Sequence, residues 1–230
     1  TERGTNLEKN GVYINTSEHV LAAAVGLEID NLIIEINSAE PPIMEGSSKM
    51  FIQALEKAGI VEQESEREVF IVKENITYKD EETGSEIVLM PSDEYQITTL
   101  VDFGTNVLGT QNATLNRISD FKKEISEART FSFLHELEAL LDHNLIKGGD
   151  LNNAIVYVDQ VISDKTMEKL KKAFNKTDIS VKPNGVLDNL ELRWPNEAAR
   201  HKLLDVVGDL ALAGMRIRGK VIATKPGHKV

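Results

Sequence analysis

Residues 201–215 place charged side chains inside an otherwise apolar run. His201, Asp205 and Asp209 lie four residues apart, and the positions between and after them are mostly Leu, Val, Ala and Gly. Because positions four apart share one face of a helix, the pattern predicts a buried helix with a polar stripe. An ionised carboxylate that is buried without a partner is strongly destabilising. The stripe therefore favours a cation beside it, although a hydrogen-bonded histidine and an ion-paired aspartate would satisfy the same pattern.

A second motif, Ser17-Glu18-His19, lies at the start of another expected helix. The chain has no cysteine, so a metal would be held by imidazole and carboxylate groups. If the two motifs face each other, His19 joins His201 and Asp205, and Glu18 becomes a general base. Zinc with three such ligands keeps a position open for water, as catalytic sites do. Alternatively, Glu18 only complements the dipole of its helix.

The C-terminal segment carries His228 in a turn after an apolar strand. A loop imidazole there can protonate a leaving amine, and Asp209 can orient it. The last fifteen residues are basic and contain no acidic residue, against the negative charge of the whole chain. That local field would suit a diphosphate. A solvated histidine and solvated strand ends remain the alternatives.

Aromatic side chains adjoin a hydroxyl group in the segment Thr130-Phe131-Ser132-Phe133. The residues that follow include leucines at helical spacing, so one face of the expected helix is apolar enough to line an acyl-chain groove. Packing in the core would explain the same periodicity.

Composition excludes several classes of protein. The formal net charge of -11 repels phosphate backbones, and no basic residues alternate with aromatic ones, so we expect no nucleic-acid partner. The longest apolar stretches are too short to span a bilayer, and the N-terminus has no signal core. We therefore expect no transmembrane segment and a cytoplasmic location.

The order of patterns predicts an α+β chain with two domains. The charged run at 62–67 is the expected boundary, so residues 1–66 form a first domain and residues 67–230 a second one. Strands are expected at 12–14, 32–36, 69–72, 76–79, 86–90, 96–101 and 220–223, those from 69 to 101 in an antiparallel sheet. Helices are expected from Ser17, at 47–58, 118–127, 133–141, 165–174 and 196–215.

Several segments form a specific combination in a fixed order along the chain. They are Thr16-Ser17-Glu18-His19 with Ala24-Val25-Gly26-Leu27, Ile29-Asp30-Asn31, Pro42-Ile43-Met44-Glu45-Gly46-Ser47, Ala128-Arg129-Thr130-Phe131, Arg200-His201-Lys202-Leu203-Leu204-Asp205 with Gly208-Asp209-Leu210, and Lys225-Pro226-Gly227-His228. In these segments the chain resembles the family of UDP-3-O-acyl-N-acetylglucosamine deacetylases, zinc amidohydrolases of lipid A biosynthesis. The resemblance runs through most of the 230 residues.

The resemblance implies a two-domain sandwich in which helices pack between two sheets, with Zn²⁺ at the domain junction. It implies hydrolysis of the acetamide of an acylated UDP-amino-sugar, with a substrate passage near residues 131–160. The resemblance implies that His19, His201 and Asp205 bind the zinc ion and that Glu18 is the general base. It implies that His228, paired with Asp209, is the general acid and that the Thr130 hydroxyl contacts the oxyanion. Contacts with the substrate are implied for Lys202, Phe131 and Phe133.

The resemblance also leads us to expect that most of the first domain's initial strands precede this sequence. A dehydratase is fused beyond the C-terminus in some members, as in a bifunctional deacetylase/dehydratase. Two other readings stay open. One is a zinc amidohydrolase that acts on another amide, and the other is a metal-free α+β binding module whose acidic surface meets a protein partner.

Overall fold

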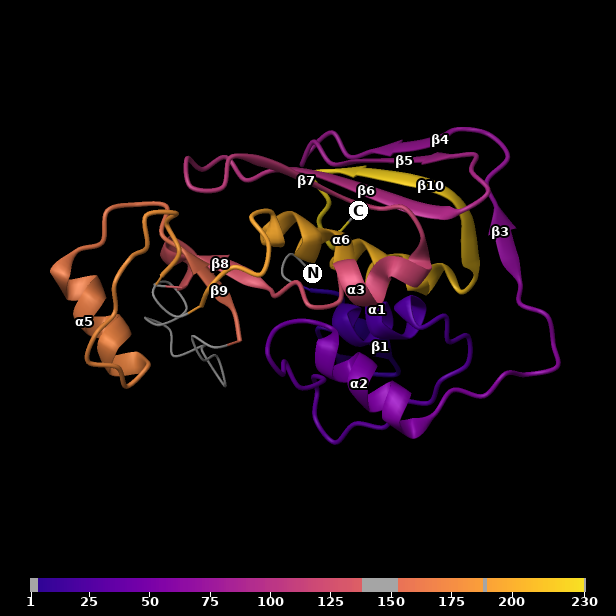
Figure 1. Cartoon of the computed structure of the whole chain (residues 1–230), viewed down its shortest axis with the longest axis horizontal. Helices are drawn as coiled ribbons and strands as arrows, with labels where there is room; N and C mark the ends of the chain where they lie inside the picture. The colour runs from indigo at the N-terminus through magenta and orange to yellow at the C-terminus, as the bar shows by residue number, and fades with distance from the viewer. Residues whose placement is uncertain (1–3, 138–152, 188–189, 230) are drawn as a thin grey trace.

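The computed structural model describes residues 4–137, 153–187 and 190–229, and it is built around a six-stranded sheet (Figure 1). The strands run in the order β4-β5-β10-β6-β7, and β3 pairs with the start of β10. Their bounds are β3 Val69–Ile71, β4 Ile76–Lys79, β5 Glu86–Met90, β6 Tyr95–Asp102, β7 Thr110–Leu115 and β10 Arg216–Thr224.

The long strand β10 holds this sheet together. Its residues alternate between buried and more exposed positions, as a strand with one face on a core requires. It pairs antiparallel with β5 but parallel with β6 and β3. The antiparallel hairpin of β4 and β5 is therefore confirmed, whereas the expectation that 69–101 form a purely antiparallel sheet is wrong. The parallel pairs arise because helical segments separate β10 from β6 in the chain, which allows a crossover connection.

Helices cover one face of the sheet (Figure 1). They are α1 (Glu18–Gly26), α2 (Lys49–Ala58), the short α3 (Phe121–Glu124) and α6 (Glu197–Leu210), with 3-10 turns at Ile118–Asp120 and Ala211–Ala213. The main core lies between sheet and helices and includes Ile97, Leu115, Phe121, Leu203, Val207 and Val221. Helix α1 packs directly on α6, where Gly208 approaches the main chain of Glu18 so closely that an added Cβ would lie 2.1 Å from its carbonyl oxygen.

The N-terminal part has less regular structure than predicted. A hairpin, β1 (Leu7–Lys9) with β2 (Val12–Ile14), precedes α1. The strand expected at 32–36 is absent, and Leu32, Ile33 and Ile34 are exposed at 41%, 88% and 45%. A strand needs a neighbour for its backbone hydrogen bonds, and none of the described strands pairs with these residues.

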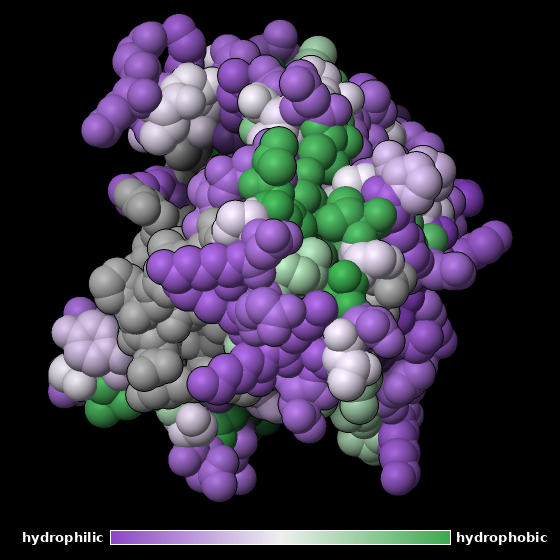
Figure 2. Space-filling view, turned by 90° about the vertical axis from the view of Figure 1, so that its left-hand side faces the viewer, coloured by the Kyte–Doolittle hydropathy of each residue, from purple (hydrophilic) through white to green (hydrophobic). Residues whose placement is uncertain are grey.

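A separate lobe contains β8 (Phe131–Phe133), β9 (Ile155–Tyr157) and α5 (Asp164–Ala173). Figure 2 shows the molecule from the side on which this lobe lies: hydrophilic residues predominate, and a patch of hydrophobic residues lies in the upper middle of the view. The strands β8 and β9 pair in parallel, so the helix expected from Phe133 begins one residue later, after the strand. The remainder of that expected helix, from residue 138, lies outside the described residues, as does much of the predicted substrate passage.

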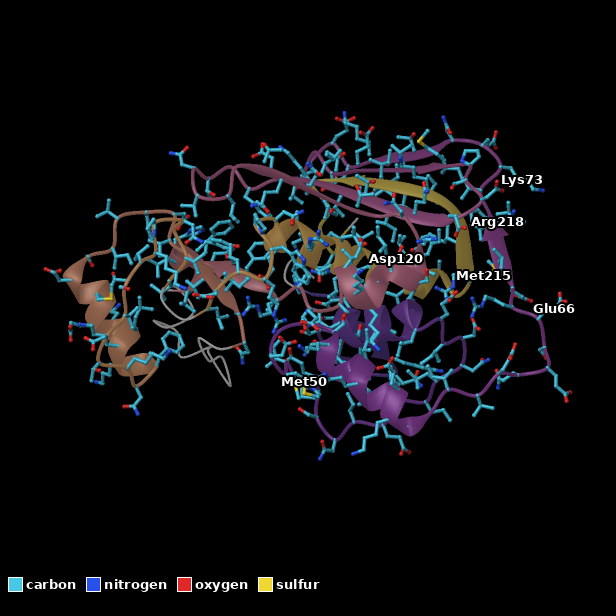
Figure 3. The ribbon with its side chains drawn as sticks, in the orientation of Figure 1. Met50, Glu66, Lys73, Asp120, Met215 and Arg218 are labelled. Atoms are coloured by element: carbon cyan, nitrogen blue, oxygen red, sulfur yellow. The ribbon has the colours of Figure 1, made fainter. Side chains whose placement is uncertain are left out.

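The chain is of the mixed α+β class, as predicted. Glu66 lies on an extended segment at the outer edge of the molecule, between the helices and β3, and Lys73 lies in the connection between β3 and β4 (Figure 3). A domain division near residue 66 stays a prediction. Within the residues described, no helix has both the length and the apolar character needed to cross a membrane.

Candidate metal centre

Helices α1 and α6 bring together three side chains that are separated by up to 186 positions in the sequence. His19 Nε2 lies 3.8 Å from Asp205 Oδ1, and His201 Nε2 lies 3.3 Å from the same oxygen. The two imidazole rings are 5.0 Å apart and meet nearly at a right angle. All three residues are buried. Their ligand atoms lie within 4.8 Å of one another, which is the spacing that one cation could bridge.

The ring of His201 has a defined tautomer. Its Nδ1 lies 3.0 Å from the carbonyl oxygen of Ala128, and a carbonyl can only accept a hydrogen bond. Nδ1 therefore carries the proton, and the lone pair of Nε2 faces Asp205. A backbone carbonyl in this position is the usual outer partner of a metal-binding histidine.

The protonation states also suit a cation. Burial lowers the pKa of His19 to about 3 and lowers the pKa of His201, so both imidazoles are neutral near pH 7. Burial opposes the charge of Asp205, but His201 and Lys202 outweigh it and hold the pKa of this carboxyl below its usual range. Two neutral imidazoles and a carboxylate are a donor set that zinc accepts.

The surroundings of one carboxylate oxygen show whether the residues fit such a cation. Asp205 Oδ1 is buried and has no hydrogen-bond partner. A buried carboxylate oxygen without a partner is costly, and here it lies beside the free Nε2 atoms of both histidines. A divalent cation would satisfy all three atoms together, so the residues fit the metal that the sequence predicts.

Glu18 lies next to these ligands at the start of α1. Its carboxyl, Asp205 and His228 form a second group whose ligand atoms are within 4.8 Å of one another. Burial raises the pKa of Glu18, and the charge of Asp205 raises it further. The Oε2 atom accepts a hydrogen bond of 3.0 Å from the backbone N–H of Thr5. This carboxyl is therefore poised to accept a proton nearer neutral pH than an exposed glutamate would.

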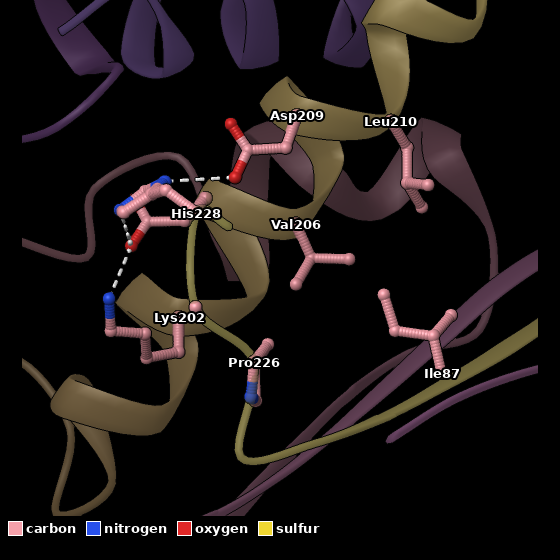
Figure 4. Close-up of a pocket in the computed structure, with 9 residues that line it drawn as sticks. Ile87, Lys202, Val206, Asp209, Leu210, Pro226 and His228 are labelled. Atoms are coloured by element: carbon pink, nitrogen blue, oxygen red, sulfur yellow. Dashed lines mark hydrogen bonds and ion pairs between the residues drawn. The ribbon is translucent and has the colours of Figure 1, made fainter. Parts of the chain in front are cut away.

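His228 approaches from the turn after β10. Its Nδ1 lies 2.9 Å from Asp209 Oδ2, and its Nε2 lies 3.8 Å from Asp205 Oδ2 (Figure 4). Burial opposes the charged imidazole, but the hydrogen bond to Asp209 and the charge of Asp205 raise the pKa of His228 overall. The histidine and Asp209 line a cavity of about 80 Å³ at the surface of α6, together with Pro226 and Ile87.

Lys202 lines the same cavity (Figure 4). Its Nζ donates a 3.0 Å hydrogen bond to Asp205 Oδ2, so the two oxygens of this carboxylate face different groups. Oδ2 faces Lys202 and His228 on the side of the cavity. Oδ1 faces the imidazoles of His19 on α1 and His201 on α6.

The aromatic residues predicted for the substrate path lie beside the centre. The ring of Phe131 is 6.3 Å from that of His201 and 6.0 Å from Lys202 Nζ. Phe133 is 6.1 Å from Phe131, and Phe103 packs against both rings. The backbone of Thr130 is fixed by its N–H donating to the Gly46 carbonyl at 2.7 Å. The contact of its hydroxyl with a substrate stays a prediction.

Four residues support the site although the sequence patterns assign them no role in it. Thr5 contacts Glu18, Asp209 and His228, but it lies in a polar N-terminal segment with no recognisable pattern. The Ala128 carbonyl is a backbone atom, which side-chain patterns do not reveal. The buried pair of Arg129 and Glu197 fixes the segment that carries this carbonyl.

Comparisons with known proteins indicate the family to which the chain is similar. The family model described as UDP-3-O-acyl N-acetylglycosamine deacetylase matches residues 1–176 and 165–230. A relative named "Bifunctional enzyme LpxC/FabZ", from Bacteroides thetaiotaomicron, is 43% identical over 230 residues, which are 100% of this chain and 50% of that protein. The protein of the same name from Porphyromonas gingivalis is 42% identical, with the same coverage of both chains.

A relative from Myxococcus xanthus carries the name "UDP-3-O-acyl-N-acetylglucosamine deacetylase". It is 36% identical over 229 residues, which are 99% of this chain and 65% of that protein. The chain thus spans about half the length of the bifunctional relatives that it matches.

Proposed function

Because the chain belongs to the UDP-3-O-acyl N-acetylglycosamine deacetylase family, we propose that it hydrolyses the acetamide of UDP-3-O-acyl-N-acetylglucosamine in a metal-dependent reaction. The products are acetate and the free amine of the sugar. The observation that carries the proposal is the buried Asp205 Oδ1, which has no hydrogen-bond partner and lies between the Nε2 atoms of His19 and His201.

We assign the metal to His19, His201 and Asp205. A zinc ion held there would polarise the amide carbonyl and acidify water, since both are Lewis-acid effects of a bound divalent cation. Three protein ligands leave room for a further one, as catalytic zinc requires.

The base and the acid come from this chain's own side chains. Glu18, with its raised pKa, accepts a proton from the attacking water, whose oxygen bonds to the acetyl carbon. His228, whose pKa is raised by its hydrogen bond to Asp209 and by the charge of Asp205, donates a proton to the nitrogen as the C–N bond breaks. The two groups come from different elements, the start of α1 and the turn after β10, and their ligand atoms lie within 4.8 Å of each other, close enough to act on one bound amide.

Thr130 would donate its hydroxyl to the oxyanion, and such a donor typically contributes about 3 to 4 kcal/mol to the transition state. Lys202 borders the cavity, which suits a contact with polar groups of the substrate. Phe131 and Phe133 would flank the path of the nucleotide sugar and its acyl chain.

The proposal extends to a fused partner. The bifunctional relatives are about twice as long as this chain, which supports a second activity in the same polypeptide, the dehydratase that the resemblance implies. A cytoplasmic location, expected from the sequence, completes the proposal.

The test is acetate release from UDP-3-O-acyl-N-acetylglucosamine by the zinc-loaded protein. Glu18→Gln should keep the metal and lower kcat by about 100-fold or more, because a general base typically contributes at least that much. Glu56→Gln is the matched control, since Glu56 lies on the surface in an ion pair with Lys122. A Glu18→Gln variant that turns over as fast as the Glu56→Gln variant would contradict the assignment.

A further inference from the structure

Thr5 connects the two halves of the proposed site. It is only 7% exposed, although it lies near the N-terminus of the described chain. Its carbonyl accepts two hydrogen bonds of 3.1 Å, from the N–H and the hydroxyl of Ser17. Ser17 therefore does not cap α1 with its side chain but holds Thr5 against the start of the helix. The position of Thr5 is thus fixed relative to the neighbouring Glu18.

The backbone N–H of Thr5 points at the base. It donates to Glu18 Oε2 at 3.0 Å, and this bond is buried. Because the donor is a main-chain group, a side-chain substitution at residue 5 leaves it in place. The contact with the base and the contact with the acid can therefore be separated by experiment.

The hydroxyl of Thr5 points at the acid pair. It donates to Asp209 Oδ1, and it lies 3.3 Å from His228 Nδ1. Asp209 then uses one oxygen for Thr5 and the other for His228 Nδ1, at 2.9 Å. With both oxygens engaged, the carboxylate of Asp209 cannot rotate without losing a hydrogen bond, and the imidazole that it holds keeps Nε2 directed at the centre.

We propose that Thr5 is a positioning residue whose hydroxyl fixes the Asp209 and His228 pair relative to Glu18. The inference rests on the proposed function for the reaction that the pair performs, but the geometry that it explains is independent of the substrate. Its partners come from α6 and from the turn after β10, which are 204 and 223 positions away in the sequence. Thr5 thus forms hydrogen bonds with both the base and the acid pair, through its backbone N–H and its hydroxyl.

The experiment compares Thr5→Val, which removes the hydroxyl at nearly constant volume, with Thr5→Ser, which keeps it. Hydrogen bonds to charged groups are among the stronger ones, so kcat should fall by about 10- to 100-fold in Thr5→Val, with KM and zinc content unchanged. Thr5→Ser should restore kcat to within about threefold of the parent protein. Thr99→Val is the matched control, because the buried hydroxyl of Thr99 donates to the Ala199 carbonyl and touches neither base nor acid.

A second readout does not depend on turnover. In protein labelled with ¹⁵N-histidine, the imidazole nitrogens of His228 can be assigned with a His228→Gln variant. At one fixed pH, their chemical shifts should change in Thr5→Val and stay the same in Thr5→Ser and Thr99→Val, because only the first loses the contact with the pair.

Each outcome decides one point. Unchanged kcat and an unchanged His228 spectrum in Thr5→Val would overturn the inference, and so would equal losses of kcat in Thr5→Val and Thr99→Val. If the parent protein released no acetate, the proposed function would fail, while the His228 spectra would still decide the role of Thr5.

Discussion

Replacing Gly208 with alanine would force apart the two helices that carry the proposed ligands. The added Cβ would lie 2.1 Å from the carbonyl oxygen of Glu18 and 2.8 Å from its carbonyl carbon. Real Cβ atoms essentially never come closer than 3.0 Å, so α1 and α6 must separate. The obstacle is main chain, which cannot rotate away as the end of a flexible side chain can.

The change in unfolding free energy follows from two opposing effects. Overpacking in a well-packed core costs about 1 to 3 kcal/mol, and a backbone obstacle favours the upper end of that range. Alanine is the better helix former by about 1 kcal/mol, which offsets part of the loss. We expect the Gly208→Ala variant to lose about 2 kcal/mol of unfolding free energy. Because His19 adjoins Glu18 and moves with α1, we also expect turnover to fall by about 100-fold.

Urea unfolding at equilibrium measures the loss of unfolding free energy, and acetate release at saturating zinc measures the loss of turnover. The sign of the stability change is decisive, because helix propensity alone predicts that alanine makes the protein more stable. A Gly208→Ala variant that unfolds at the same or a higher urea concentration than the parent would refute the close approach of α1 and α6.

Other predictions concern the supporting pair and the metal. Glu197→Ala should destabilise the protein by about 3 to 5 kcal/mol in urea unfolding, since it leaves the buried guanidinium of Arg129 without its counter-ion. Glu168→Ala breaks an exposed pair with Lys171 and should cost less than about 1 kcal/mol, so equal effects would contradict the role of burial. A metal that binds the native state stabilises it, so a chelator should lower the melting temperature of the parent protein in a calorimetric scan, and added zinc should restore it. An equal melting temperature with and without chelator would contradict metal binding to the native state.

Local patterns predicted the parts of the fold that local forces determine. The strands β2, β4 and β5 have the predicted bounds, because short runs of β-branched and other apolar residues, bounded by turn residues, are properties of a few neighbouring positions. The stripe on α6 was predicted for the same reason, since helical periodicity places His201 and Asp205 on one face. The helix ends earlier than expected, at Leu210, and a 3-10 turn precedes Gly214, whose φ is +73°.

Features that depend on distant partners escaped the sequence. Residues 32–36 have the composition of a strand, but a strand also needs a neighbour, and sequence alone does not supply one. Phe133 fits a helical pattern, yet it ends a strand that pairs with Tyr157. Thr5 is polar and lies in a short segment, so nothing local distinguishes it from a surface threonine. The partners of its hydroxyl lie more than 200 positions away.

We propose that α1 and α6 hold one metal ion between them. Metal analysis of the purified protein after incubation with zinc and removal of excess tests it directly. We expect about one zinc per chain in the parent protein and in the Glu56→Gln control, and none in His201→Ala or Asp205→Ala. A parent protein that retains no zinc, or variants that retain as much as the parent, would contradict it.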